Sequence, residues 1–115
     1  MSSVKLERLN SQIAREIARV FQHDTKNKVL KTITITAADV APDLGSAKIF
    51  YTYLGEYERE FIETELKNAS GFLRSELANK LDMRHTPELR FYFDESVSHG
   101  TNIERILSEI NNKED

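Results

Sequence analysis

Hydrophobic residues recur at every third or fourth position between Val4 and Phe21. This spacing places them on one face of a helix, and Ser3 is a suitable N-cap for it. The apolar positions are Leu6, Leu9, Ile13, Ile17, Val20 and Phe21. The pattern predicts an amphipathic first helix that packs against a core.

Three later segments alternate between apolar and polar residues, as half-buried strands do. The first covers residues 31–37, with the odd-numbered positions facing inward. The second covers residues 47–54 and follows a turn signal at 42–45. The third covers residues 88–94, with Leu89, Phe91 and Phe93 facing inward. We expect the first two strands to pair antiparallel, and a right-handed crossover makes the last two parallel. One sheet face then stays open, with Thr32, Thr34, Thr36, Lys48, Phe50, Thr52, Arg90 and Tyr92 on it.

A second helical pattern runs from Glu56 to Leu81. Unbroken, these 26 residues would form a helix about 39 Å long, which overshoots a domain of this size. Weak helix formers stand in mid-run, so we predict a kink or a helix-turn-helix at Ala69, Ser70 and Gly71.

A last helix is predicted from Thr101, where a capping box precedes Ile103, Ile106, Leu107 and Ile110, and residues 112–115 should fray. The element order is therefore α-β-β-α-α-β-α. It predicts one α+β domain over residues 1–115, with a three-stranded sheet and helices on one of its faces.

Composition excludes several classes of protein. The chain has 115 residues, 39% hydrophobic and 30% charged, and no window that approaches the roughly 20 apolar residues of a spanning helix. It has no cysteine, which removes disulfides and thiolate zinc sites, and no apolar signal segment follows Met1. A soluble, cytoplasmic protein is expected.

The net charge of −3 argues against nucleic acid as a partner, because phosphate binding depends on Lys and Arg. Its distribution weakens that objection. Residues 1–55 carry a net charge of +3 and residues 66–92 carry +2, whereas 56–65 and 93–115 each carry −4. A basic face on an acidic protein is therefore possible.

Cationic residues form two candidate surfaces. The first is a stripe on the first helix, composed of Lys5, Arg8, Gln12, Arg15 and Arg19, which either contacts phosphates or is a solvated face with Arg19 paired to Glu16. The second runs from the second helix to the third strand through Lys67, Arg74, Lys80, Arg84, His85 and Arg90. On the open sheet face, Phe50 and Tyr92 either stack on bases or pack on each other.

Nothing in the sequence points to an enzyme. The three histidines are far apart, no carboxylate stands at metal-ligand spacing from them, and four glycines form neither a phosphate-binding loop nor a dinucleotide fingerprint. No metal, cofactor or small-molecule substrate is expected.

Four stretches together resemble the ribosome-binding factor A family along nearly the whole chain. They are the first helix with Arg8, residues 42–50 (PDLGSAKIF), residues 68–74 (NASGFLR) and residues 83–94 (MRHTPELRFYFD). The predicted order of elements is that of a type II KH domain. Ordinary KH domains clamp nucleic acid with a GxxG loop, which this chain lacks. Ala69-Ser70-Gly71 looks instead like the Ala-x-Gly kink of the family.

This resemblance implies a monomeric, non-catalytic factor that binds the small (30S) ribosomal subunit and its 16S rRNA near the neck and decoding region. It also implies late maturation of the rRNA ends and a role in cold adaptation. The candidate RNA-binding residues are Lys67, Asn68, Ser70, Arg74, Lys80, Arg84, His85 and Arg90, with Lys5, Arg8, Arg15 and Arg19 on the first helix.

Two other functions remain open from the sequence. One is a protein-interaction adaptor that uses the open sheet face and the acidic last helix. The other is a KH-like regulator of messenger RNA.

Overall fold

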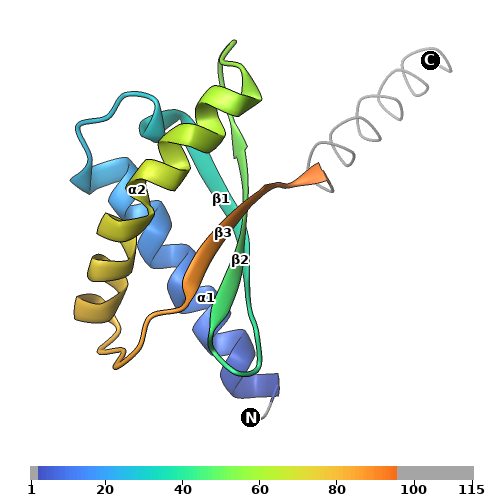
Figure 1. The fold of residues 1–115 in the computed structure, drawn as a ribbon, viewed down its shortest axis with the longest axis vertical. Coiled ribbons are helices and arrows are strands. Elements are labelled where there is room, and N and C mark those ends of the chain that lie inside the picture. Colours follow the sequence, from blue (N-terminus) through green and yellow to red (C-terminus); the bar gives the residue numbers. More distant parts are fainter. Residues whose placement is uncertain (1–2, 96–115) are drawn as a thin grey trace, which may run out of the picture.

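The computed structural model describes residues 3–95 (Figure 1). The predicted last helix and the frayed tail lie outside these residues. The elements are α1 (Ser3–Arg19), a π-helical turn (Val20–Asp24), a 3-10 turn (Leu30–Thr32), β1 (Ile33–Val40), β2 (Ser46–Tyr53), α2 (Arg59–Lys80) and β3 (Glu88–Phe93). No described helix is long and apolar enough to cross a membrane.

The sheet has the strand order β1-β2-β3, with β1 and β2 antiparallel and β2 and β3 parallel. Both pairings confirm the predictions, as does the α+β class. The helices cover one face of the sheet, because one set of alternating strand positions is buried with the apolar sides of α1 and α2. This core contains Ile13, Ile17, Val20, Phe21, Leu30, Ile33, Val40, Ala47, Ile49, Tyr51, Ile62, Leu66, Leu73, Leu77 and Leu89.

The inward positions of β1 change half-way along the strand. Ile33 faces the core as predicted, but Ala37 is exposed and Val40 is buried, so the prediction that all odd positions face inward is wrong. The pairing register skips Thr36, and a single extra residue moves every following side chain to the opposite face. The hydroxyl of Thr36 donates a hydrogen bond to the carboxylate of Asp94, which follows β3.

The open face consequently differs at β1 from the predicted one. Thr32 belongs to the 3-10 turn rather than to a strand, and Thr36 lies at the bulge. The residues that occupy this face are Thr34, Ala37, Asp39, Lys48, Phe50, Thr52, Glu88, Arg90 and Tyr92.

The chain from Arg59 to Lys80 forms one α-helix without interruption. The predicted helix pair, and with it the helix-turn-helix, is therefore wrong. The helix begins later than expected because Gly55, with φ +103°, turns the chain after β2, and its 22 residues span about 33 Å. Figure 1 shows that the axis of α2 changes direction about half-way along its length, which agrees with the kink predicted as the alternative.

Candidate nucleic-acid interface

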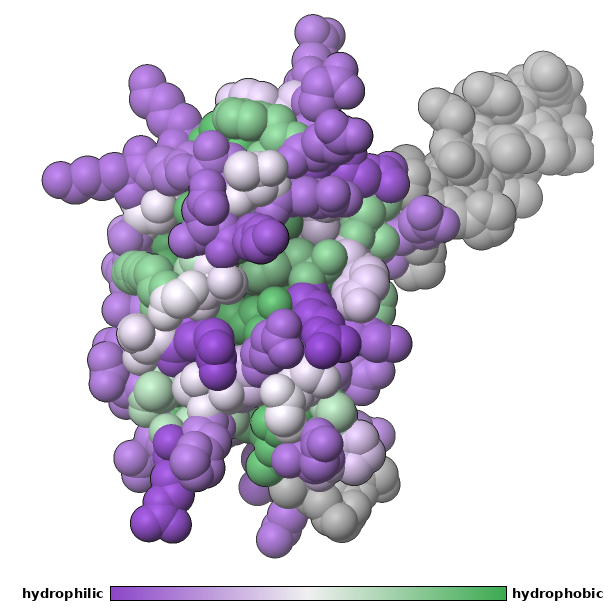
Figure 2. All heavy atoms as spheres, viewed as in Figure 1, coloured by the Kyte–Doolittle hydropathy of each residue, from purple (hydrophilic) through white to green (hydrophobic). Residues whose placement is uncertain are grey.

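A groove of about 930 Å³ lies between α2 and β3. Its lining residues are Gly45, Glu63, Lys67, Ser70, Arg74, Glu88, Leu89, Phe91 and Tyr92. In Figure 2, apolar surface is visible at the floor between hydrophilic rims. β3 is the last strand in the sheet order, and side chains from both of its faces line the groove. The groove therefore runs along the edge of β3 that pairs with no strand of the described chain. Backbone donors and acceptors at such an edge are available to a ligand.

The helical rim of the groove is polar, with two cations, one carboxylate and one hydroxyl. Glu63, Lys67, Ser70 and Arg74 follow one another at intervals of four, three and four residues, which places them on one side of α2. The hydroxyl of Ser70 donates to the carbonyl oxygen of Lys67 at 2.8 Å. Lys67 is exposed, so its ammonium group is accessible from the groove.

Arg74 is held in place by the segment that precedes β3. Its Nη2 donates to the carbonyl oxygen of Thr86 at 3.1 Å, and its Nε lies 3.3 Å from Thr86 Oγ1. A guanidinium group has five N–H donors, so these two contacts leave others for a ligand. Arg74 therefore contributes a positioned positive charge to the groove.

A second hollow, of about 560 Å³, lies beside the groove. Arg84 and His85 line it together with the turn at Asp43, Leu44 and Gly45. Gly45 lines both hollows, and its carbonyl oxygen accepts a hydrogen bond from the N–H of Glu88 at 3.0 Å. The structure thus gathers Lys67, Ser70, Arg74, Arg84 and His85 along one continuous surface.

Ala69, Ser70 and Gly71 are helical residues within α2. Gly71 has no positive φ, and a Cβ added to it would meet no atom within 4 Å. The backbone conformation at position 71 therefore does not require glycine. Asn68 is exposed on α2, three residues before Gly71.

We expect Gly71→Ala to raise the free energy of unfolding by up to about 1 kcal/mol, because alanine loses less backbone entropy in a helix than glycine does. Urea denaturation measures this change. Ser75→Gly, at an exposed position one turn further on, is the matched control and should lower stability by a few tenths of a kcal/mol. Destabilisation by Gly71→Ala would mean that the backbone at this position is not helical.

The other candidate residues lie away from the groove. Lys80 is exposed in the last turn of α2, and Arg90 lies on the open sheet face, 3.4 Å from Glu88. The remaining candidates belong to α1, where Lys5, Arg8 and Arg15 are exposed.

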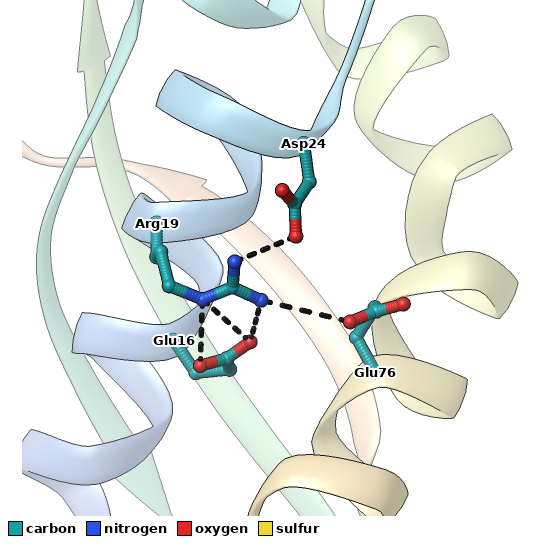
Figure 3. A network of polar contacts seen from close by, with 4 residues as sticks. All are labelled: Glu16, Arg19, Asp24 and Glu76. Atoms are coloured by element: carbon teal, nitrogen blue, oxygen red, sulfur yellow. Dashed lines mark hydrogen bonds and ion pairs between the residues drawn. The ribbon is translucent and has the colours of Figure 1, made fainter.

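Arg19 is engaged in a network that connects α1 to α2 (Figure 3). Its guanidinium lies 2.6 Å from Asp24 and 3.6 Å from Glu76, and its Nε donates to Glu16 at 3.1 Å. The hydrogen bonds to Glu16, then to Asp24, raise the pKa of Arg19 above its ordinary value. The alternative in which Arg19 pairs with Glu16 is confirmed, and this residue is structural.

The aromatic residues of the open face pack on each other. The rings of Phe50 and Tyr92 have centroids 6.1 Å apart at 35°, and Lys48 Nζ lies 6.0 Å from the centroid of Tyr92. This confirms the cross-strand contact that the sequence left as an alternative to base stacking.

Sequence reasoning missed part of the groove. Glu63 could have been found from its helical spacing to Lys67 and Ser70, whereas the roles of Leu89 and Phe91 in the floor depend on how α2 crosses β3. Within residues 3–95, no group of three acidic or histidine side chains could hold a metal ion.

A family model described as Ribosome-binding factor A matches residues 5–107. The chain belongs to the ribosome-binding factor A family. Ribosome-binding factor A of Natranaerobius thermophilus is 37% identical over 100% of this chain and 88% of its own length. That of Ruthia magnifica is 41% identical over 95% of this chain and 96% of its own.

Solved structures of ribosome-binding factor A share the fold. The crystal structure from Thermus thermophilus has a TM-score of 0.69 at 24% identity, covering 76% of this chain and 93% of that one. A Thermus thermophilus homology model fitted into the cryo-EM map of a 30S-RbfA complex has a TM-score of 0.62 at 24% identity, covering 75% and 91%.

Proposed function

We propose that this chain is an assembly factor that binds the small (30S) ribosomal subunit through its 16S rRNA. The observation that carries the proposal is the groove between α2 and β3, which combines positioned cations, an apolar floor and a strand edge. Membership of the ribosome-binding factor A family supports the choice of ribosomal RNA over messenger RNA.

The groove suits single-stranded RNA. Lys67 and Arg74 supply positive charge for phosphates, and the floor at Leu89 and Phe91 accepts the apolar faces of bases. Glu63 and Glu88 repel phosphates but accept hydrogen bonds from the amino groups of bases. The cations of the groove therefore contact the RNA backbone, and its carboxylates contact the bases. This arrangement favours one direction of the RNA strand in the groove.

The role in assembly follows from binding rather than from catalysis. An RNA strand held in the groove is unavailable for premature pairing, so the factor assists late maturation and processing of the rRNA ends by keeping that region accessible. Mispaired RNA is more persistent at low temperature, which makes the same activity valuable in the cold. The protein acts in the cytoplasm, where subunits are assembled.

Salt dependence of subunit binding tests the groove. We expect Lys67→Ala and Arg74→Ala each to lower the log-log salt slope of binding to purified small subunits by about 0.7–0.9, because each removes one phosphate contact and its counterion release. Filter binding at several salt concentrations gives the slope. Lys48→Ala, which removes the same charge from the open sheet face, is the control and should leave the slope unchanged.

Arg74 also holds the segment before β3, so thermal melts of each variant accompany the binding measurements. Wild-type slopes in both folded groove variants would exclude the groove as the RNA interface. Sedimentation with subunits before and after RNase treatment separates RNA binding from the adaptor hypothesis, since only RNA binding is lost when the rRNA is cut.

A further inference from the structure

The connection between α1 and β1 is a concentrated positive region in an acidic protein. Residues 25–32 contain Lys26, Lys28 and Lys31 and no acidic residue, which gives +3 in a chain whose net charge is −3. All three lysines are exposed, and none forms an ion pair within residues 3–95.

Asn27 organises this connection from its centre. Its Oδ1 accepts the N–H groups of Val29 at 2.8 Å and Leu30 at 3.3 Å, and its backbone carbonyl accepts the N–H of Lys31 at 3.2 Å. Its Nδ2 donates to Glu65 of α2 at 2.9 Å. The Asn27 side chain thus fixes the backbone of the segment that carries the three lysines and links this segment to α2.

Three further contacts fix the connection, one within it and two to the rest of the molecule. Leu30 is buried in the core, and the Thr32 hydroxyl donates to the carbonyl oxygen of Val29 at 2.6 Å. The carbonyl oxygen of Thr32 accepts the N–H of Leu54 at 3.1 Å. The three lysine Cα positions are therefore set before any ligand arrives, which reduces the entropy cost of binding one.

The carboxylates next to the connection are already engaged. Asp24 lies 2.6 Å from Arg19, and Glu65 accepts the hydrogen bond from Asn27. Neither forms an ion pair with a lysine of the connection, so the positive charge of the connection is directed to solvent.

The connection and the groove lie on different sides of α2. Glu65, to which Asn27 is fastened, stands two residues before Lys67, and a separation of two residues is about 200° around a helix. Glu76, which contacts Arg19 of α1, lies on the same flank as Glu65. The lysines therefore occupy the α1 side of α2, and the groove occupies its β3 side.

We propose that Lys26, Lys28 and Lys31 form a second RNA-binding surface that contacts rRNA phosphates independently of the groove. The proposal rests on the proposed function of the chain as an rRNA-binding protein. Ammonium groups bind phosphate oxygens as point charges, and no aromatic side chain stands among residues 25–32 to stack on a base. This surface positions the protein on RNA without recognising the base sequence. Because the groove and this surface bind the same particle, each contact increases the affinity of the other.

The first test removes charge from the full-length chain in matched pairs. We expect Lys26→Ala with Lys28→Ala to lower the salt slope of binding to purified small subunits by about 1.4–1.8, which is two lost phosphate contacts. The control pair, Lys48→Ala with Arg59→Ala, removes the same charge from exposed positions outside the connection and the groove, and should leave the slope unchanged. Equal slopes for the two pairs would overturn the proposal.

The same measurement separates this proposal from the proposed function. A slope that falls with Lys67→Ala but stays at the wild-type value in the Lys26 and Lys28 pair overturns the second surface and leaves the groove intact. A slope that falls in both, with the reductions adding when all three are combined, supports two independent contacts.

A second test locates the RNA directly and uses the absence of cysteine from the chain. Lys28→Cys carries a tethered Fe-EDTA group, which cleaves nearby RNA by hydroxyl radicals when the protein is bound to purified small subunits. We expect rRNA cuts that are absent when the tether is at Lys48→Cys. A cleavage pattern equal to that of untethered Fe-EDTA would show that no rRNA lies at this connection.

Discussion

Replacing Phe21 with alanine should lower the free energy of unfolding by about 3–5 kcal/mol, the largest effect expected of any single change described for this protein. Phe21 is fully buried and stands in the π-helical turn that follows α1, within the core formed by both helices and the sheet. Truncation removes its burial and leaves a cavity that the surrounding residues fill only in part. Urea denaturation monitored by circular dichroism measures the loss.

Phe72→Ala is the matched control for this substitution. Phe72 is 46% exposed on α2, so the same truncation should cost less than about 1 kcal/mol. Similar losses for the two variants would mean that Phe21 is not part of the core, and that the turn after α1 is packed differently.

Tyr51→Phe should raise the free energy of unfolding by about 1–3 kcal/mol, because it removes a buried hydroxyl that lacks a hydrogen-bond partner in the described structure. The ring itself is fully buried and packs edge-on against Phe93, with centroids 5.9 Å apart. The phenylalanine keeps this packing. Only the cost of the unpaired oxygen is removed.

The pH dependence of stability provides a second readout of Tyr51. Burial, and then the charge of Glu63, raise the pKa of the Tyr51 hydroxyl above its ordinary value. The folded state therefore retains this proton where the unfolded chain releases it, so stability should fall as the pH rises above about 10. Tyr51→Phe should remove this part of the decline.

Tyr53→Phe is the control for the hydroxyl. The Tyr53 oxygen donates to the carbonyl oxygen of Tyr57 at 3.2 Å, so its removal should lower stability or leave it unchanged. A loss of stability in Tyr51→Phe as well would show that the buried hydroxyl is hydrogen-bonded in solution.

Local sequence patterns predicted the elements because their periods are properties of short segments. The spacing of apolar residues by three and four positions up to Phe21 predicted α1. The alternation of Leu89, Phe91 and Phe93 with polar residues predicted which side of β3 faces the helices. The bulge at Thr36 has no such local signal. It is joined by a hydrogen bond to Asp94, 58 residues later, and only the folded chain brings the two together.

The helix-turn-helix predicted in α2 depended on the length of the helical pattern. That length assumed a start at Glu56, whereas the turn at Gly55 delays the start to Arg59 and the shorter helix fits the domain. The position predicted for the helix-turn-helix, at residues 69–71, rested on the poor helix propensity of Ser70 and Gly71. A weak propensity of one residue is readily overcome by the packing of Leu66, Leu73 and Leu77 on the same helix.

The candidate site was predicted from a run of cationic residues along the chain. The structure places Lys67 and Arg74 of that run in the groove, and Arg84 and His85 in the hollow beside it. Arg90 was associated with them through charge alone, but strand alternation sends its side chain to the other face of the sheet. Charge also made Arg19 a candidate, but in the structure its guanidinium group forms ion pairs with three carboxylates.

The parallel pairing of β2 with β3 has a consequence for the order of folding. β1 and β2 are joined by a short turn and can pair early, whereas Ser46 and Glu88 are partners separated by 42 positions in the chain and by all of α2. Closing so long a loop is slow relative to forming a hairpin or a helix. We expect β3 to join the sheet last, so a nascent chain acquires its groove only after synthesis has passed Phe93.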